Sequence, residues 1–96
     1  MASNFKIVIH QNSDNQHLKL IGDFDGSSAW QLLNTLKKIL TNKQRIIVHT
    51  NSLNNIDSFG LDTFHRNFHD LKIKHFPVLF TGEHARKISP ENKLYR

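Results

Sequence analysis

The chain has 96 residues, 38% of them hydrophobic, and its 13 Lys and Arg against 8 Asp and Glu give a formal net charge of +5 with the seven His neutral. This length fits one domain, residues 1–96, whose small core leaves little room for a deep substrate cavity. The absence of cysteine from the sequence excludes a disulfide framework, a thiolate zinc site, a thiol nucleophile and a redox pair.

The N-terminus and the charge pattern predict a soluble protein. No basic N-terminal region precedes a long apolar one, and no apolar run reaches the roughly 18–20 residues that span a bilayer. The basic residues are spread along the chain and interleaved with acids, which is typical of a solvated surface rather than of a nucleic-acid footprint. We therefore predict a cytoplasmic protein that neither inserts into a membrane nor binds nucleic acid.

The first half of the chain alternates apolar and polar residues and then changes to helical spacing. Residues 5–10 and 17–22 each alternate, and the turn-forming residues between them predict a β-hairpin that Gly22 ends. Oxygen-bearing side chains over residues 23–28 can cap a helix. Apolar residues then recur at intervals of three and four and predict an amphipathic helix that residues 41–43 close: Ala29, Leu32, Leu33, Leu36, Ile39 and Leu40.

The second half begins with a strand and a second helix. Residues 46–48 are a continuous β-branched run, typical of a strand that is covered on both faces, and we place them at the centre of the sheet. Residues 51–55 are rich in Asn and Ser and predict a loop. A helix that starts near Phe59 presents one apolar side, made of Leu61, Phe64, Phe68 and Leu71.

The last part of the chain predicts a short strand and a short helix. Pro77 cannot donate to a ladder, so the strand proper is residues 78–80. Residues 83–88 predict one or two helical turns. The order β-β-α-β-α-β predicts a single α/β domain with a mixed sheet of about four strands and helices on one face, with its core at about 5–88 and a tail at 89–96.

Two motifs stand at the starts of the two predicted helices. Gly22 and Asp25 form a Gly-x-x-Asp turn before the first, and residues 57–61 read Asp-Ser-Phe-Gly-Leu at the second. With the buried strand 46–48 ahead of the second motif, residues 5–88 resemble the STAS family, the domain shared by anti-sigma factor antagonists and anion-transporter tails. The resemblance implies a bacterial regulator of transcription that acts by partner switching.

The resemblance also implies the site and the partner. Ser58 aligns with the serine that a partner kinase phosphorylates, and the partner is an anti-sigma factor with serine kinase character. The helix start near Phe59 forms much of the partner-binding face, to which we assign Asp25, Asp57, Ser58, Phe59, Gly60 and Leu61.

The residues themselves support this switch and also allow a simpler role. Asp57 or Ser58 can cap the unpaired N–H groups of a helix start, whose positive end favours a negative group. Phosphorylation of Ser58 would add about −1.5 to −2 charges beside Asp57 and switch partner binding off. Alternatively, Asp57 and Ser58 are only an N-cap pair and Gly60 is a packing glycine.

Three features depart from the family. Residues 49–51 read His-Thr-Asn where many members have an acidic residue. Phe59 replaces a small residue and is either an exposed anchor, which we favour, or a core residue. Trp30, which is not one of these departures, either covers the edge of the core, which we favour, or is an exposed recognition residue. The chain ends at Arg96, before the C-terminal elements of most members.

Short STAS chains resemble the small cytoplasmic subunits that dock on the ATPase of phospholipid-trafficking ABC transporters, which is our alternative function.

Other residue constellations predict no chemistry. His65 and His69 are four apart on one helix, as two metal ligands would be, but without a visible third ligand we predict no metal, and we expect the other, dispersed histidines in solvent. Because Ser58 lies in no Gly-x-Ser-x-Gly elbow and the four glycines are scattered, we predict no enzyme, no catalytic residue and no cofactor. A less favoured hypothesis is that a face around Asp25, Asn51 and Ser58 senses an anion or a nucleotide.

Overall fold

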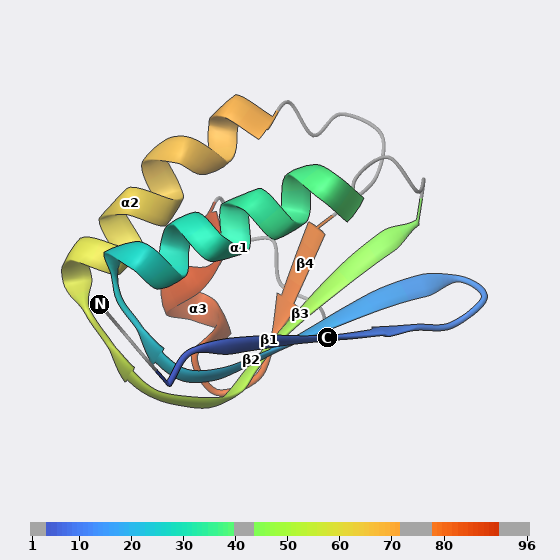
Figure 1. The fold of residues 1–96 in the computed structure, drawn as a ribbon, viewed down its shortest axis with the longest axis horizontal. Helices are drawn as coiled ribbons and strands as arrows, with labels where there is room; N and C mark the ends of the chain where they lie inside the picture. The colour runs from blue at the N-terminus through green and yellow to red at the C-terminus, as the bar shows by residue number, and fades with distance from the viewer. Residues whose placement is uncertain (1–3, 40–43, 72–77, 91–96) are drawn as a thin grey trace.

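The computed structural model describes residues 4–39, 44–71 and 78–90, which form a sheet with helices packed on it (Figure 1). In chain order the elements are β1 (Lys6–Gln11), β2 (Asn15–Phe24), α1 (Gly26–Ile39), β3 (Arg45–Ile56), α2 (Ser58–Phe68), the 3-10 turn η2 (His69–Leu71), β4 (Val78–Thr81) and α3 (Ala85–Ile88). The predicted order of elements is confirmed. The predicted helix closure at 41–43, Pro77 and the tail beyond residue 90 lie outside the described residues.

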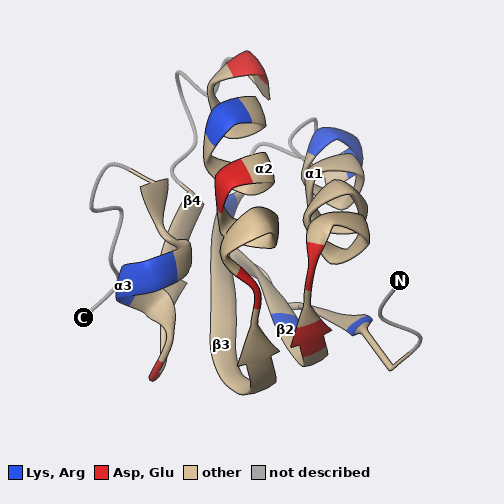
Figure 2. Cartoon of the chain, turned by 90° about the vertical axis from the view of Figure 1, so that its left-hand side faces the viewer, with Lys and Arg blue, Asp and Glu red and all other residues tan. Residues whose placement is uncertain are grey.

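The four strands form a mixed sheet in the order β1-β2-β3-β4. β1 pairs antiparallel with β2, whereas β2, β3 and β4 run parallel. Parallel neighbours need a crossover, and α1 provides it between β2 and β3. α1 and α2 lie side by side over the same face of the sheet, and α3 packs beside β4 (Figures 1 and 2). The predicted α/β class, with its helices on one face, is therefore confirmed.

The core fills the space between the sheet and the two long helices. Phe64 of α2 stands at its centre, with ring centroids 6.2 Å from Phe24, 5.9 Å from Phe80 and 5.5 Å from Phe68. The contacts with Phe24 and Phe80 are edge-to-face, the arrangement that aromatic quadrupoles favour. Aliphatic side chains of β2, α1 and β3 complete the layer: Leu18, Leu20, Leu32, Leu36, Ile46 and Val48.

Two predictions about the strands were wrong. Residues 51–55 belong to β3, which continues to Ile56, because β2 pairs with this stretch and only Leu53 has to be buried, so the Asn and Ser side chains remain at or near the surface. Gly22 does not end β2, which runs on to Phe24. Gly22 has φ +100° beside an irregularity in the β2–β3 register, and a side chain there would collide with the Asn4 carbonyl.

Among the described helices, none is both long and apolar enough to cross a membrane.

Candidate functional site

The starts of α1 and α2 meet at one end of the sheet. The backbone N–H of Asp57 donates to the Phe24 carbonyl at 2.9 Å, which joins the residue before α2 to the last residue of β2. Asp25, the next residue along the chain, precedes α1. Since β2 and β3 are parallel, their carboxyl ends lie at the same edge, and the two sequence motifs come together there. In Figure 2 acidic residues mark the lower ends of both helices.

Two glycines allow this close approach. A Cβ on Gly60 would lie 2.7 Å from the Asp25 carbonyl carbon and 2.8 Å from its oxygen, both backbone atoms. A Cβ on Gly26 would lie 2.9 Å from Cε2 of Phe59, the end of a side chain. Each helix thus presents a glycine to the other. Gly60 is buried, and the absence of a side chain on it allows the short distance between the two helix starts.

Asp25 caps α1. Its Oδ1 accepts hydrogen bonds from the Ser28 N–H at 2.9 Å, the Ser27 hydroxyl at 3.0 Å and the Ser28 hydroxyl at 3.1 Å. The Ser28 N–H is the largest influence on the Asp25 pKa and lowers it, partial burial raises it, and the two hydroxyls lower it further, so that it lies below 3.8. The carboxylate is therefore ionised and committed to the helix start.

Asp57, one of the two predicted capping residues, caps α2. Its backbone is extended, at φ −82° and ψ 135°, and its Oδ1 accepts from the Phe59 N–H at 3.4 Å. Ser58 is the first residue of α2 and is exposed, and its hydroxyl has no hydrogen-bond partner in the described part of the chain. The capping of this helix start falls to Asp57, which leaves the Ser58 hydroxyl accessible.

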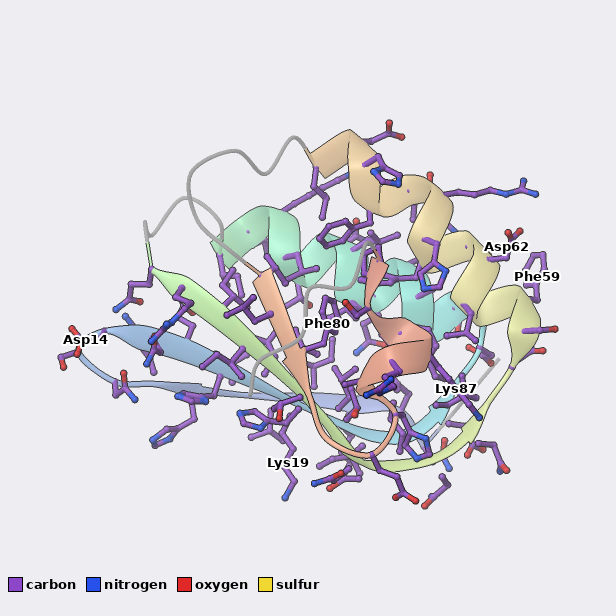
Figure 3. All side chains as sticks on the ribbon, turned by 180° about the vertical axis from the view of Figure 1, so that it is seen from behind. Asp14, Lys19, Phe59, Asp62, Phe80 and Lys87 are labelled. Carbon is purple, nitrogen blue, oxygen red and sulfur yellow. The ribbon has the colours of Figure 1, made fainter. Side chains whose placement is uncertain are left out.

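Phe59 is 66% exposed, as the favoured interpretation expected, and the alternative that it is a core residue is excluded (Figure 3). Trp30 is 47% exposed and lies one helical turn beyond Gly26, against which the Phe59 ring rests. Leu61 is partly buried and packs against the core. Two large apolar side chains are therefore exposed near the helix starts, Phe59 beside Gly26 and Trp30 one turn further along α1.

The other candidate constellations are placed differently. Asn51 lies in the middle of β3, where its side chain accepts from the Glu83 N–H, and no described contact joins it to Asp25 or Ser58. A ring nitrogen of His65 lies 3.0 Å from the Ile88 carbonyl, which ties α2 to α3. Within the ranges that the structure describes, no three potential ligands gather into a metal site.

Sequence reasoning missed a second candidate site, a hollow on the face of the sheet opposite α1 and α2. It is lined by Val8, His10, His17, Lys19, His49, Asn51 and Ser52. The prediction that these histidines are dispersed was wrong, because strand pairing gathers three of them. His10 is exposed, as expected, but His17 and His49 are partly buried. The signal for His10 and His17 was their symmetric placement about the hairpin turn. His49 could be added only from the parallel register.

Comparison with known proteins shows what fold this is. No model of a protein family matches the sequence, and no curated protein does. The unphosphorylated anti-sigma factor antagonist SpoIIAA superposes with a TM-score of 0.59 at 16% identity, over 90% of this chain and 84% of that one. An anti-sigma factor antagonist from Mycobacterium paratuberculosis gives 0.60 at 14% identity, over 84% and 70%. The structure of Mglu gives 0.67 at 17% identity over 79% of this chain, which spans only 19% of Mglu. The chain thus has the STAS-like fold that its motifs predicted.

Gly60→Ala tests the contact between the helix starts. We expect the free energy of unfolding to fall by about 1–2 kcal/mol, because the new methyl meets backbone that cannot turn aside. The matched control is Gly26→Ala, whose methyl meets an exposed ring that can rotate, and which should be neutral or gain up to about 1 kcal/mol from helix propensity. Urea denaturation followed by circular dichroism measures both. Equal losses in the two variants would contradict this account.

Asp25→Ala tests the cap of α1. At neutral pH we expect a loss of about 1 kcal/mol in the free energy of unfolding, typical of an N-cap. Because the pKa is lowered on folding, this stabilisation is complete above the ordinary pKa of 3.8 and disappears as the pH falls through the lowered value. Denaturation of both proteins across that pH range should show the difference shrinking in acid. Ser27→Ala, which removes one of the three bonds, should lose less.

Proposed function

We propose that the chain is a non-catalytic regulatory module of bacterial cytoplasm that binds a protein partner through the starts of α1 and α2, and that phosphorylation of Ser58 switches the binding off. The observation that carries the proposal is the accessible Ser58 hydroxyl next to Phe59, the most exposed large apolar side chain among the described residues. The STAS-like fold supports it, since two of the structures with this fold are anti-sigma factor antagonists.

The partner face has the composition of a binding surface. Phe59 and Trp30 are large, exposed aromatic side chains of the kind that anchor protein interfaces. The helix starts also carry carboxylates, because Asp25 and Asp57 cap them, and Asp62 of α2 forms an ion pair with Arg66 at 3.1 Å. We infer a partner that offers an apolar pocket with a polar or basic rim. An anti-sigma factor with serine kinase character fits this description.

The switch acts through hydration and charge. In the complex, Ser58 would lie beside the Phe59 anchor, where water is excluded. A phosphate there would bring a charge of about −1.5 to −2 and its hydration shell into that contact, next to the Asp57 carboxylate. The same phosphate would sit at the positive end of α2, which tolerates an anion, so the fold itself would persist. Phosphorylation would change the surface and leave the domain folded.

The alternative, a permanent subunit docked on a transporter ATPase, would use the same face. The docked subunit differs from the switch in one respect: it needs no phosphate on Ser58. Intact-mass measurement of the chain purified with its partner from native cells separates the two functions. A phosphorylated fraction supports the switch, whereas stable co-purification with an ATPase and an unmodified Ser58 supports the subunit.

Ser58→Asp should weaken partner binding at least about tenfold, because it places a fixed negative charge where the phosphate would be. Ser58→Ala should bind within about twofold of the unmodified protein, since it removes only a hydroxyl. Ser13→Asp, an exposed change in the hairpin turn between β1 and β2, controls for added charge alone. Isothermal titration with the captured partner measures the three affinities. Equal binding by the two Ser58 variants would refute the switch.

Phe59→Ala should weaken partner binding by about tenfold to a hundredfold, as expected for an aromatic anchor. Because the ring is 66% exposed, the free energy of unfolding should change by no more than about 0.5 kcal/mol. The control is Val8→Ala, which also truncates a half-exposed apolar side chain but lies on the opposite face of the sheet. Unchanged affinity in the Phe59 variant would remove this residue from the partner face.

A further inference from the structure

The hollow opposite the helices has the size and position of a ligand site. Its volume is about 520 Å³, within the range of small-molecule sites, and its walls come from three adjacent strands. Strand pairing sets His10 opposite His17 and Lys19 opposite His49. Figure 3 shows Lys19 pointing away from the helices. None of these residues belongs to the proposed partner face, so this inference does not rest on the proposed function.

The described residues that line the hollow include bases and no carboxylate. β1 contributes His10, β2 contributes His17 and Lys19, and β3 contributes His49. β4 brings Leu79 and Thr81 alongside, and neither is charged. Glu83, in the loop after β4, has its carboxylate 3.9 Å from Nε2 of His84. The described walls of the hollow are therefore positive or neutral and offer N–H and O–H donors from Asn51 and Ser52 besides the bases.

His17 and His49 form a pair whose contact limits its charge. Their rings are stacked, with centroids 5.1 Å apart, and Nδ1 of His17 lies 2.8 Å from Nε2 of His49. The Asn12 side-chain amide nitrogen lies 3.4 Å from Nε2 of His17 and donates to it, so a neutral His17 carries its proton on Nδ1 and donates to His49. If both rings were protonated, the N–H on Nδ1 of His17 would face the N–H on Nε2 of His49.

The surroundings also favour the neutral form of His49. Burial is the largest influence that lowers the pKa of His49, followed by the positive charges of His17 and Lys19. The negative charge of an anion in the hollow would counteract the effects of His17 and Lys19 on the His49 pKa. The anion would also give the N–H groups of a doubly protonated pair an acceptor other than each other.

We propose that this hollow binds a small phosphate-bearing molecule, and that the His17–His49 pair takes up a proton when it binds. Lys19 supplies the permanent charge, the histidine pair supplies a charge that appears with the ligand, and Asn51 and Ser52 supply donors. Binding is therefore tighter in mildly acidic than in neutral solution, by up to about tenfold per pH unit for one linked proton.

The probe for the pH dependence is inorganic sulfate, a phosphate analogue whose own charge stays constant between about pH 5.5 and 7.5. Sulfate is titrated into the full chain at both pH values, and the imidazole proton resonances are followed by NMR. We expect saturable shifts of His17 and His49, a smaller dissociation constant at the lower pH, and a raised pKa of His49 in the saturated protein. Absence of saturable shifts at these two histidines would overturn the proposal.

Two variants and one control make the result specific. Lys19→Gln should weaken binding at both pH values, and His49→Gln should bind with little pH dependence. Lys87→Gln removes one exposed charge from α3, away from the hollow, and should bind like the unmodified chain. An equal loss in the Lys19 and Lys87 variants would show attraction to net charge only and would refute a site. Titration with pyrophosphate and with acetate separates phosphate from carboxylate; tighter binding of acetate would overturn the assigned ligand class.

Discussion

The hydrogen bond from the Asp57 N–H to the Phe24 carbonyl is the constraint on which the functional end of the molecule depends. It fixes the start of α2 to the end of β2, one residue before Asp25 caps α1. The approach is so close that Gly60 has room for no side chain against the Asp25 backbone. The positions of Ser58 and Phe59 follow from this contact, because both belong to the turn of α2 that Gly60 anchors.

The same arrangement gives the domain two unlike surfaces. At the helix starts, Asp25 and Asp57 are used as caps, and Asp23 accepts from the Asn55 side chain, so three carboxylates lie at this end of the sheet. On the opposite face of the sheet, His10, His17, His49 and Lys19 gather without a carboxylate among the described lining residues. Although the net charge of the chain is +5, the carboxylates named here lie at one proposed site and the basic residues at the other.

Each proposed site uses groups whose charge can change. At the helix starts a covalent phosphate would change the charge of a face that is otherwise set by ionised caps. In the hollow Lys19 carries a permanent charge, and the proposed second charge would appear on the His17–His49 pair when an anion binds. A STAS-like domain with both features could respond to a kinase at one surface and to an anion at another.

The order of elements, the hairpin and both amphipathic helices could be predicted from the sequence, because they depend on neighbours within a few residues of one another. The candidate caps could be predicted as well, but the structure selected Asp25 among residues 23–28 and Asp57 over Ser58. The sequence also predicted that Phe59 is exposed, which is confirmed, and that Phe59 anchors a partner, which stays a prediction. It misjudged residues 51–55, since pairing with β2 outweighed the turn preference of Asn and Ser. Only the tertiary structure showed the contact of Gly60 with Asp25 and the pairing of His17 with His49. Those contacts join residues far apart in the chain, and their existence depends on the parallel register of β2 and β3, which no local pattern specifies.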